Sequence, residues 1–243
     1  MKNKKFFLLD WDDNILVMPS KIYLDKLFKG NWIKISVNSE ELKSIKNKIG
    51  KNYRLRPDSF DEFKREKKFI SDLKYSLENK KFGPCFEKFK NALINVEDFG
   101  IITARGHSPN NLKNGVKFLV KHVLTPKEKK IMIKNLGKTS FNHYLNRQKY
   151  RTVSSPQFFK EFNLNGDHKI EIGKKIAYTD YIENVVRGTN ISVGYSDDDL
   201  TNVKVIETLI KKELKNKFPN IKFVMYDTSN PNKIKKKVIN GGH

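Results

Sequence analysis

Short runs of apolar residues that end in a carboxylate or a hydroxyl recur along the chain. Four of them are clear: residues 5–10, 99–103, 191–197 and 221–227. Runs of this length, bounded by polar residues, predict strands that are buried on both faces of a parallel sheet. A further strand is predicted over residues 32–37.

Helical patterns separate these runs. Apolar residues recur three and four positions apart over 112–123, 170–185 and 203–214. Ser108 followed by Pro109 predicts a helix start, because serine caps a helix and proline fits its first position. Strands that alternate with helices predict an α/β fold, namely a Rossmann-like parallel sheet with helices on both faces.

Two stretches interrupt this alternation. Residues 19–81 exceed what a single crossover between strands needs, and the apolar spacing over 59–77 predicts that this insertion is mainly helical. A second, less regular insertion lies near 125–165, and the lysine-bearing tail at 230–243 is predicted to be flexible. The predicted core comprises residues 1–18 and 82–229 and includes this second insertion.

The chain is strongly basic. Its 243 residues include 49 Lys and Arg against 27 Asp and Glu, a net charge of 49 − 27 = +22. This charge favours anionic partners such as nucleic acid or phosphorylated metabolites. The lysines are spread along the chain, however, so a solvated lysine-rich surface explains the excess equally well.

Composition also limits the location of the protein. Cys85 is the only cysteine, which excludes an intrachain disulfide and a cysteine-based zinc site. No apolar run approaches the roughly 18 residues of a membrane span. We therefore expect a cytoplasmic protein with no membrane association and no obligate protein partner.

Candidate chemistry lies where the predicted strands end. In an open parallel sheet, ligands bind at the carboxyl ends of the strands. The acids and hydroxyls at these ends are expected to meet in one crevice: Asp10, Asp12, Thr103, Asp197 and Asp198. Clustered carboxylates repel one another unless a cation joins them, and Mg²⁺, which prefers oxygen ligands and commonly binds phosphate, is the expected cation.

These strand ends resemble the motifs of the haloacid dehalogenase (HAD) superfamily. All four motifs have counterparts in the family's order: residues 7–14, residues 101–103, Lys174 or Lys175, and residues 192–198. The chain departs from the first motif in having Asn14 where Thr or Val is usual, after an additional acid, Asp13.

The resemblance implies a hydrolase, a Mg²⁺-dependent phosphomonoester phosphatase. Asp10 would be the nucleophile that forms an aspartyl-phosphate, and Asp12 would act first as general acid and then as general base. Thr103 would donate its hydroxyl to a phosphoryl oxygen, and Lys174 would offset negative charge on the nucleophile and the phosphate. Lys174 is preferred over Lys175 because it shares a helix face with Ala177, Tyr178 and Tyr181.

The resemblance also implies a set of metal ligands. Mg²⁺ would be held by Asp10, by the backbone carbonyl of Asp12, and by Asp197 or Asp198, between which the sequence does not decide. The third acid of that run, Asp199, is instead expected to cap the helix that begins at Leu200.

Substrate contacts are expected from the loop after the second motif. Ala104 and Arg105 follow Thr103 directly, and Lys175 neighbours the third motif. Arg105 could bind a substrate phosphate through two parallel hydrogen bonds, although a surface arginine in a loop is an equal alternative.

The insertion at 19–81 would be a cap that closes over the site, as in this superfamily. The substrate would be a phosphorylated small molecule, such as a nucleotide, or a nucleic acid terminus. The alternative function is a non-catalytic, basic nucleic-acid-binding module that retains the HAD fold.

Overall fold

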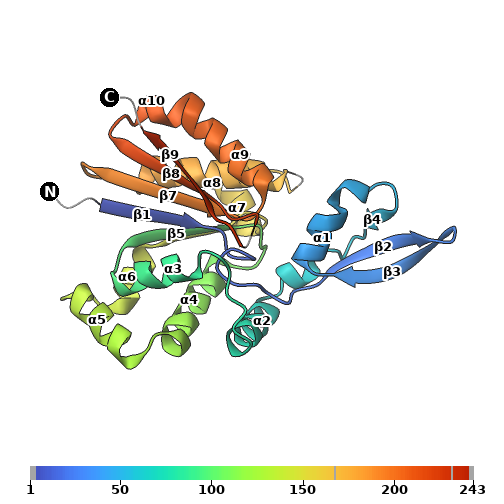
Figure 1. Ribbon diagram of the computed structural model, residues 1–243, viewed down its shortest axis with the longest axis horizontal. Coiled ribbons are helices and arrows are strands. Elements are labelled where there is room, and N and C mark those ends of the chain that lie inside the picture. Colours follow the sequence, from blue (N-terminus) through green and yellow to red (C-terminus); the bar gives the residue numbers. More distant parts are fainter. Residues whose placement is uncertain (1–3, 167, 231, 241–243) are drawn as a thin grey trace.

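The computed structural model describes residues 4–166, 168–230 and 232–240. Its centre is a six-stranded sheet with helices on both faces, and a smaller unit projects to one side (Figure 1). The strands are, in spatial order, β6 (Lys149–Thr152), β5 (Asp98–Thr103), β1 (Lys4–Leu9), β7 (Ile191–Asp197), β8 (Ile221–Asp227) and β9 (Lys235–Asn240). All neighbours are parallel except β9, which pairs antiparallel with β8. The predicted α/β class with a mostly parallel sheet is confirmed.

The strand β1 lies at the centre of this sheet because its side chains are apolar on both faces. Leu8 and Leu9 point to opposite faces and are both buried. The register sets Leu9 opposite Ile101 of β5 and Ser196 of β7. The carboxyl ends of three strands that are far apart in the sequence therefore lie next to one another.

Helices on each face complete two apolar clusters. One face is covered by α2 (Glu66–Glu78), α3 (Phe86–Ile94), α4 (Pro109–Val123), α5 (Pro126–Leu136) and α6 (Phe141–Arg147). The other face is covered by α7 (Pro156–Glu161), α8 (Ile170–Asn184) and α9 (Leu200–Leu209), and α9 continues through a π-helical turn into α10 (Lys215–Lys217). The predicted start of α4 is confirmed, because the Ser108 hydroxyl accepts a hydrogen bond from the Asn111 backbone N–H at 3.3 Å.

The projecting part, which we call the outer unit, comprises residues 21–63. It contains β2 (Ile22–Phe28), β3 (Asn31–Val37), α1 (Ser39–Ile45) and β4 (Tyr53–Leu55), with short 3₁₀ turns at Lys46–Lys48 and Asp61–Phe63. Its three strands form an antiparallel sheet in the order β3-β2-β4. The strand predicted over 32–37 is confirmed as part of β3.

The predicted insertion over 19–81 combines the helices α1 and α2 with a three-stranded sheet, of which only the strand over 32–37 was predicted. Apolar residues alternate along β2, where Ile22 and Leu24 are buried together with Val37 of β3. This period of two favours a sheet. The helix predicted over 59–77 starts only at Glu66, and it packs on the core through Phe69 and Leu73.

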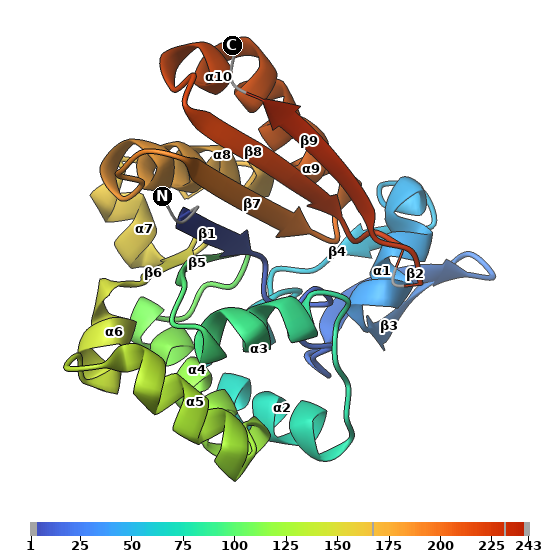
Figure 2. The ribbon, with the colours of Figure 1, turned by 60° about the vertical axis from the view of Figure 1, so that its left-hand side comes forward.

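Two further boundaries differ from the prediction. Residues 125–165 are not an insertion, because β6 is a strand of the main sheet and Tyr144 lies in the core cluster. The predicted flexible tail is wrong for residues 235–240, which form β9 beside β8 (Figure 2). Pairing along an open sheet edge and burial of Ile239 order this lysine-rich segment. Residues 231 and 241–243 of that tail lie outside the described residues.

None of the helices in the described ranges is long and apolar enough to cross a lipid bilayer.

Candidate functional site

Three acids meet at the carboxyl end of the central strands. Asp10 directly follows β1, Asp197 ends β7, and Asp198 follows it. One carboxylate oxygen from each residue lies within 4.8 Å of the others, and all three side chains are buried. The Asp10 backbone N–H donates to the Ser196 carbonyl at 3.0 Å, so the sheet ladder itself sets this arrangement. The predicted convergence of these acids is confirmed.

Lys174 of α8 reaches this acidic cluster of Asp10, Asp197 and Asp198. Its ammonium donates to Asp197 Oδ2 at 2.7 Å and lies 3.2 Å from Asp10 Oδ1. Burial opposes the charged form of Lys174, but the attraction of Asp10 and Asp197 outweighs it and raises the pKa of this lysine. The lysine is therefore a fixed positive charge at the centre of the cluster.

Lys175 does not belong to the site. It is half-exposed, and its ammonium lies 3.3 Å from Glu213 on the outer surface. Successive helical residues point in directions about 100° apart, so only one of the two lysines can face the acids. Lys174 is thus the lysine that reaches the acids, as the helix periodicity predicted, and Lys175 lies on another face of α8.

The two neighbouring acids differ in how their oxygens are used. Asp197 accepts four hydrogen bonds: from Lys174 Nζ and the Tyr195 hydroxyl, both at 2.7 Å, from the Asp199 backbone N–H at 2.9 Å and from Asn202 Nδ2 at 3.1 Å. Asp198 forms an ion pair through one oxygen with Lys43. Asp198 therefore has more capacity for a further ligand than Asp197. Asp199 caps α9 as expected, since its carboxylate accepts from the Thr201 N–H at 2.8 Å.

The acidic cluster fits a divalent cation. Asp10 Oδ1 is buried and, apart from its ion pair with Lys174, has no hydrogen-bond partner among the described residues. Burial, with the repulsion of Asp197 added to it, raises the pKa of both Asp10 and Asp198. Three carboxylates against Lys174 and Lys43 leave negative charge that a cation would offset, and an all-oxygen donor set suits a hard ion. The buried acids could therefore hold a metal ion.

Asp12 and Arg105 form a separate pair beside this cluster. Arg105 Nε donates to Asp12 Oδ2 at 2.9 Å, and Nη2 donates to Asp12 Oδ1 at 2.6 Å. The Asp12 carboxylate is not one of the clustered metal-competent groups, so only its backbone carbonyl remains as the ligand named in the prediction. The guanidinium that was predicted to bind a substrate phosphate is fully buried and forms an ion pair with Asp12.

The hydroxyl and loop after β5 lie next to these groups. Thr103 ends β5 and is fully buried, and its Oγ1 accepts from the Arg105 backbone N–H at 3.3 Å. Ala104 follows it in an exposed position of the loop. Thr103 is therefore at the predicted strand end, adjacent to the strand that leads to Asp10.

Asn14 stabilises the turn that follows β1 through side-chain hydrogen bonds, a role that the sequence did not indicate. Its Nδ2 donates to the Asp10 carbonyl at 3.0 Å and to Ser196 Oγ at 2.8 Å, while its Oδ1 accepts from Thr228 Oγ1 at 3.0 Å. It is fully buried. The departure from the first motif thus links the ends of β1, β7 and β8, and that departure was the only signal that the sequence contained.

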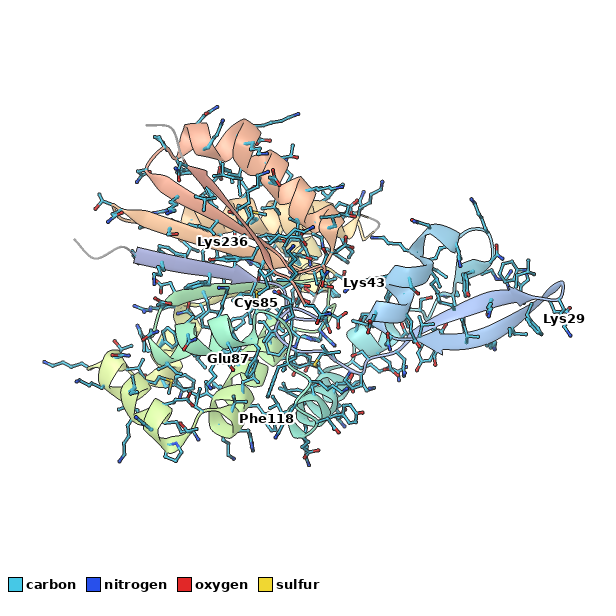
Figure 3. All side chains as sticks on the ribbon, viewed as in Figure 1. Lys29, Lys43, Cys85, Glu87, Phe118 and Lys236 are labelled. Carbon is cyan, nitrogen blue, oxygen red and sulfur yellow. The ribbon has the colours of Figure 1, made fainter. Side chains whose placement is uncertain are left out.

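The outer unit contributes lysines to the site. Lys43 of α1 forms an ion pair with Asp198 and lies 3.3 Å from Asp13, and Lys46 lies 3.0 Å from Asp199. Figure 3 shows Lys43 between the outer unit and the core. Burial raises the pKa of Asp13 to about 6 even though Lys43 opposes the shift. Lys43 and Asp198 are 155 positions apart in a lysine-rich chain, so no local pattern could pair them.

Comparison with known protein families, with curated proteins and with solved structures finds no significant match to this chain. The geometry of the acids, Lys174 and Arg105 is therefore the basis for a functional conclusion.

Proposed function

We propose that the protein is a Mg²⁺-dependent phosphatase that hydrolyses phosphomonoesters through an aspartyl-phosphate on Asp10. The observation that supports this proposal is that Asp10, Asp197 and Asp198 lie around Lys174 at the buried carboxyl ends of β1 and β7. Acids at these positions of the chain are those that resemble the HAD motifs.

The first half of the reaction would transfer the phosphoryl group to the protein. A carboxylate oxygen of Asp10 attacks phosphorus, and the bond between phosphorus and the leaving oxygen breaks. Protonated Asp12 gives its proton to that oxygen, so the leaving group departs as a neutral alcohol. Lys174, 3.2 Å from Asp10 Oδ1, holds the nucleophile and offsets charge that accumulates beside it.

The second half would regenerate the protein. A water molecule attacks phosphorus of the aspartyl-phosphate, its proton passes to the Asp12 carboxylate, and the phosphorus–Asp10 bond breaks. The products are inorganic phosphate, free Asp10 and protonated Asp12, as at the start. The Thr103 hydroxyl at the end of β5 would donate to a phosphoryl oxygen in both halves.

Asp10, Asp198 and the Asp12 carbonyl would hold the Mg²⁺ ion. When bound, the ion would supply positive charge that reduces repulsion between the nucleophile and the phosphoryl group. Asp197, with four hydrogen-bond donors, would orient Lys174 rather than ligate.

Hydrolysis of a panel of phosphomonoesters with and without Mg²⁺ tests the proposal. Asp10→Asn should lower the rate by about 10⁴-fold or more, because it removes the nucleophile. Asp25→Asn is the matched control, since Asp25 pairs with Arg54 in the outer unit, away from the acidic cluster. Mg²⁺ with beryllium fluoride, a phosphoryl mimic, should raise the melting temperature of the wild type but not of Asp10→Asn. A wild type that hydrolyses nothing in the panel and ignores the mimic would contradict the proposal.

The net charge of +22 favours one alternative, a basic nucleic-acid-binding module without catalysis. That function predicts salt-sensitive oligonucleotide binding that persists in Asp10→Asn and in the presence of EDTA. A phosphatase that acts on a nucleic acid terminus would instead release phosphate from that terminus, and one that acts on a phosphorylated small molecule would ignore the oligonucleotide.

A further inference from the structure

Arg105 is a fully buried charged residue for which the reaction above has no role. Both oxygens of Asp12 accept from its guanidinium, through Nε and Nη2. Such a two-point ion pair fixes the plane of the carboxylate as well as its position. Of its donors, Nη1 is buried and has no hydrogen-bond partner among the described residues. Two of the three guanidinium nitrogens of Arg105 therefore contact Asp12, and the third, Nη1, is shielded from solvent.

The same guanidinium contacts the segment that leads from the core into the outer unit. Arg105 Nη2 donates to Ser20 Oγ at 2.9 Å, just before β2 begins. The Ser20 hydroxyl in turn donates to Asp72 Oδ2 of α2 at 2.6 Å. Ser20 and Asp72 are both buried, so these bonds are shielded from water.

Arg105 also contacts the segment that leads back from the outer unit to the core. Its guanidinium carbon lies 5.0 Å from the centre of the Phe63 ring and 5.1 Å from that of Phe69. Gly106, the residue directly after Arg105, donates its backbone N–H to the Phe63 carbonyl at 3.1 Å. Arg105 thus contacts Asp12 and both of the chain segments that link the outer unit to the core.

We propose that Arg105 is the positioning residue of the general acid Asp12. Through Arg105, the orientation of the Asp12 carboxyl group depends on how the outer unit is positioned against the core. The inference rests on the proposed phosphatase function. It assigns Arg105 to the step in which the phosphorus–oxygen bond breaks while the Asp12 proton moves to the leaving oxygen. That transfer leaves Asp12 as the carboxylate that Arg105 binds through both oxygens. Proton donation requires a short, aligned contact with that oxygen, and a carboxyl group that rotates freely provides it only part of the time.

A series of leaving groups separates this role from a structural one. Leaving groups that are stable as anions, such as 2,4-dinitrophenolate, need no proton, whereas alkoxides do. Arg105→Met should lower kcat/KM about 100-fold for alkyl phosphates and less than about fivefold for 2,4-dinitrophenyl phosphate, within the range of general acid catalysis. Asp12→Asn should show the same pattern, and the double variant should lose no more than Asp12→Asn alone, because the two residues act as a unit.

Two further variants keep the test decisive. Arg105→Lys retains the charge but not the two-point contact, and it should lose selectively on alkyl phosphates as well. Arg151→Met is the matched control, since Arg151 is also a largely buried, ion-paired arginine, but it lies on the outer strand β6 and pairs with Glu161 and Asp180. It should leave the leaving-group dependence unchanged. An equal loss on every substrate, or an Arg105→Lys variant with wild-type rates on alkyl phosphates, would overturn the inference.

The contact between Arg105 and the outer unit can also be tested by a measurement that does not depend on activity. Hydrogen exchange in the metal-free protein should accelerate over 19–21 and 61–65 in Arg105→Met, and in Arg105→Lys if the methionine variant does not fold. It should stay unchanged there in Arg151→Met. Unchanged exchange in the Arg105 variants would overturn the coupling. A wild-type protein that is inactive on the whole series of substrates would overturn the proposed function, and with it the role of Asp12 as general acid. Hydrogen exchange would still decide whether Arg105 is coupled to the outer unit.

Discussion

Lys174 and Lys43 bind the same acidic cluster from two regions that are built differently. Lys174 belongs to the core, and only 2% of its side chain is exposed. Lys43 belongs to the outer unit, with 40% of its side chain exposed, on a helix that has no buried residue. The core surrounds its lysine with packed side chains, whereas the outer unit reaches the cluster through the long, half-exposed side chain of Lys43.

The apolar clusters of the two regions explain this difference. The core has a large cluster on each face of its sheet. The outer unit buries only Ile22, Leu24 and Val37 in its own cluster, while Phe28 at its tip is 51% exposed. A region with so little buried apolar surface has low stability of its own. We expect the outer unit to depend on its polar attachments, and the comparison can be tested by paired substitutions.

The largest expected difference lies between Lys174→Met and Lys43→Met. Removing Lys174 leaves buried Asp10 and Asp197 without their counterion, which should lower the free energy of unfolding by about 3–5 kcal/mol. Removing the half-exposed Lys43 should cost about 1 kcal/mol or less. Urea denaturation in the presence of EDTA measures both. Equal losses would mean that the two lysines are held in the same way.

A cavity in each region should unfold different parts of the molecule. Ile101→Ala in β5 should lower the global free energy of unfolding by about 2–5 kcal/mol, because this side chain is fully buried in the core. Leu24→Ala should cost a similar amount, but the loss should be confined to the outer unit. Residue-level hydrogen exchange distinguishes the two. If Leu24→Ala exposes the core strands as well, the two regions unfold as one.

Asp13 lies between the regions and should produce a pH-dependent difference. Its pKa is raised by burial to about 6, so the folded protein holds an extra proton between about pH 4 and pH 6. The free energy of unfolding should therefore fall as pH rises through this window, by up to about 3 kcal/mol. Asp13→Asn should remove this fall.

The measurement is the difference between wild type and Asp13→Asn at each pH. His107 acts in the opposite direction, because burial and Arg105 lower its pKa to about 4, but it is present in both proteins and cancels. A difference that does not change with pH, or that changes with the opposite sign, would contradict the assignment.

The smallest expected effect concerns Lys46. Its ion pair with Asp199 is exposed, so Lys46→Met should cost about 0.2–1 kcal/mol in 20 mM salt and nothing measurable in 500 mM salt, where screening is strong. Lys48→Met, in the same 3₁₀ turn, is the control because Lys48 forms no ion pair among the described residues. A loss that persists at high salt would mean that this pair is better shielded than its exposure indicates.

The four main strands could be predicted because their signal is local. An apolar run such as the one before Asp10 can satisfy its backbone only in a sheet and its side chains only in a core. The same rule placed Asp10 and Asp197 at one sheet edge, and helix periodicity selected Lys174 over Lys175. The sheet of the outer unit was predicted only in part because its strands are half-exposed. The lysine-rich β9 was missed because pairing with β8 stabilises it more than its own composition does.

The sequence by itself determined which elements form, and therefore that carboxylates from distant segments end at one edge of the sheet. Only the tertiary structure decided which donor each oxygen receives: Arg105 turned to Asp12, Asn14 joined three strand ends, and Lys43 reached Asp198 from another unit. The physical reason is the range of the forces involved. Burial of apolar side chains follows the periodicity of neighbouring residues, whereas a hydrogen bond or ion pair depends on atoms that only folding brings within about 3 Å.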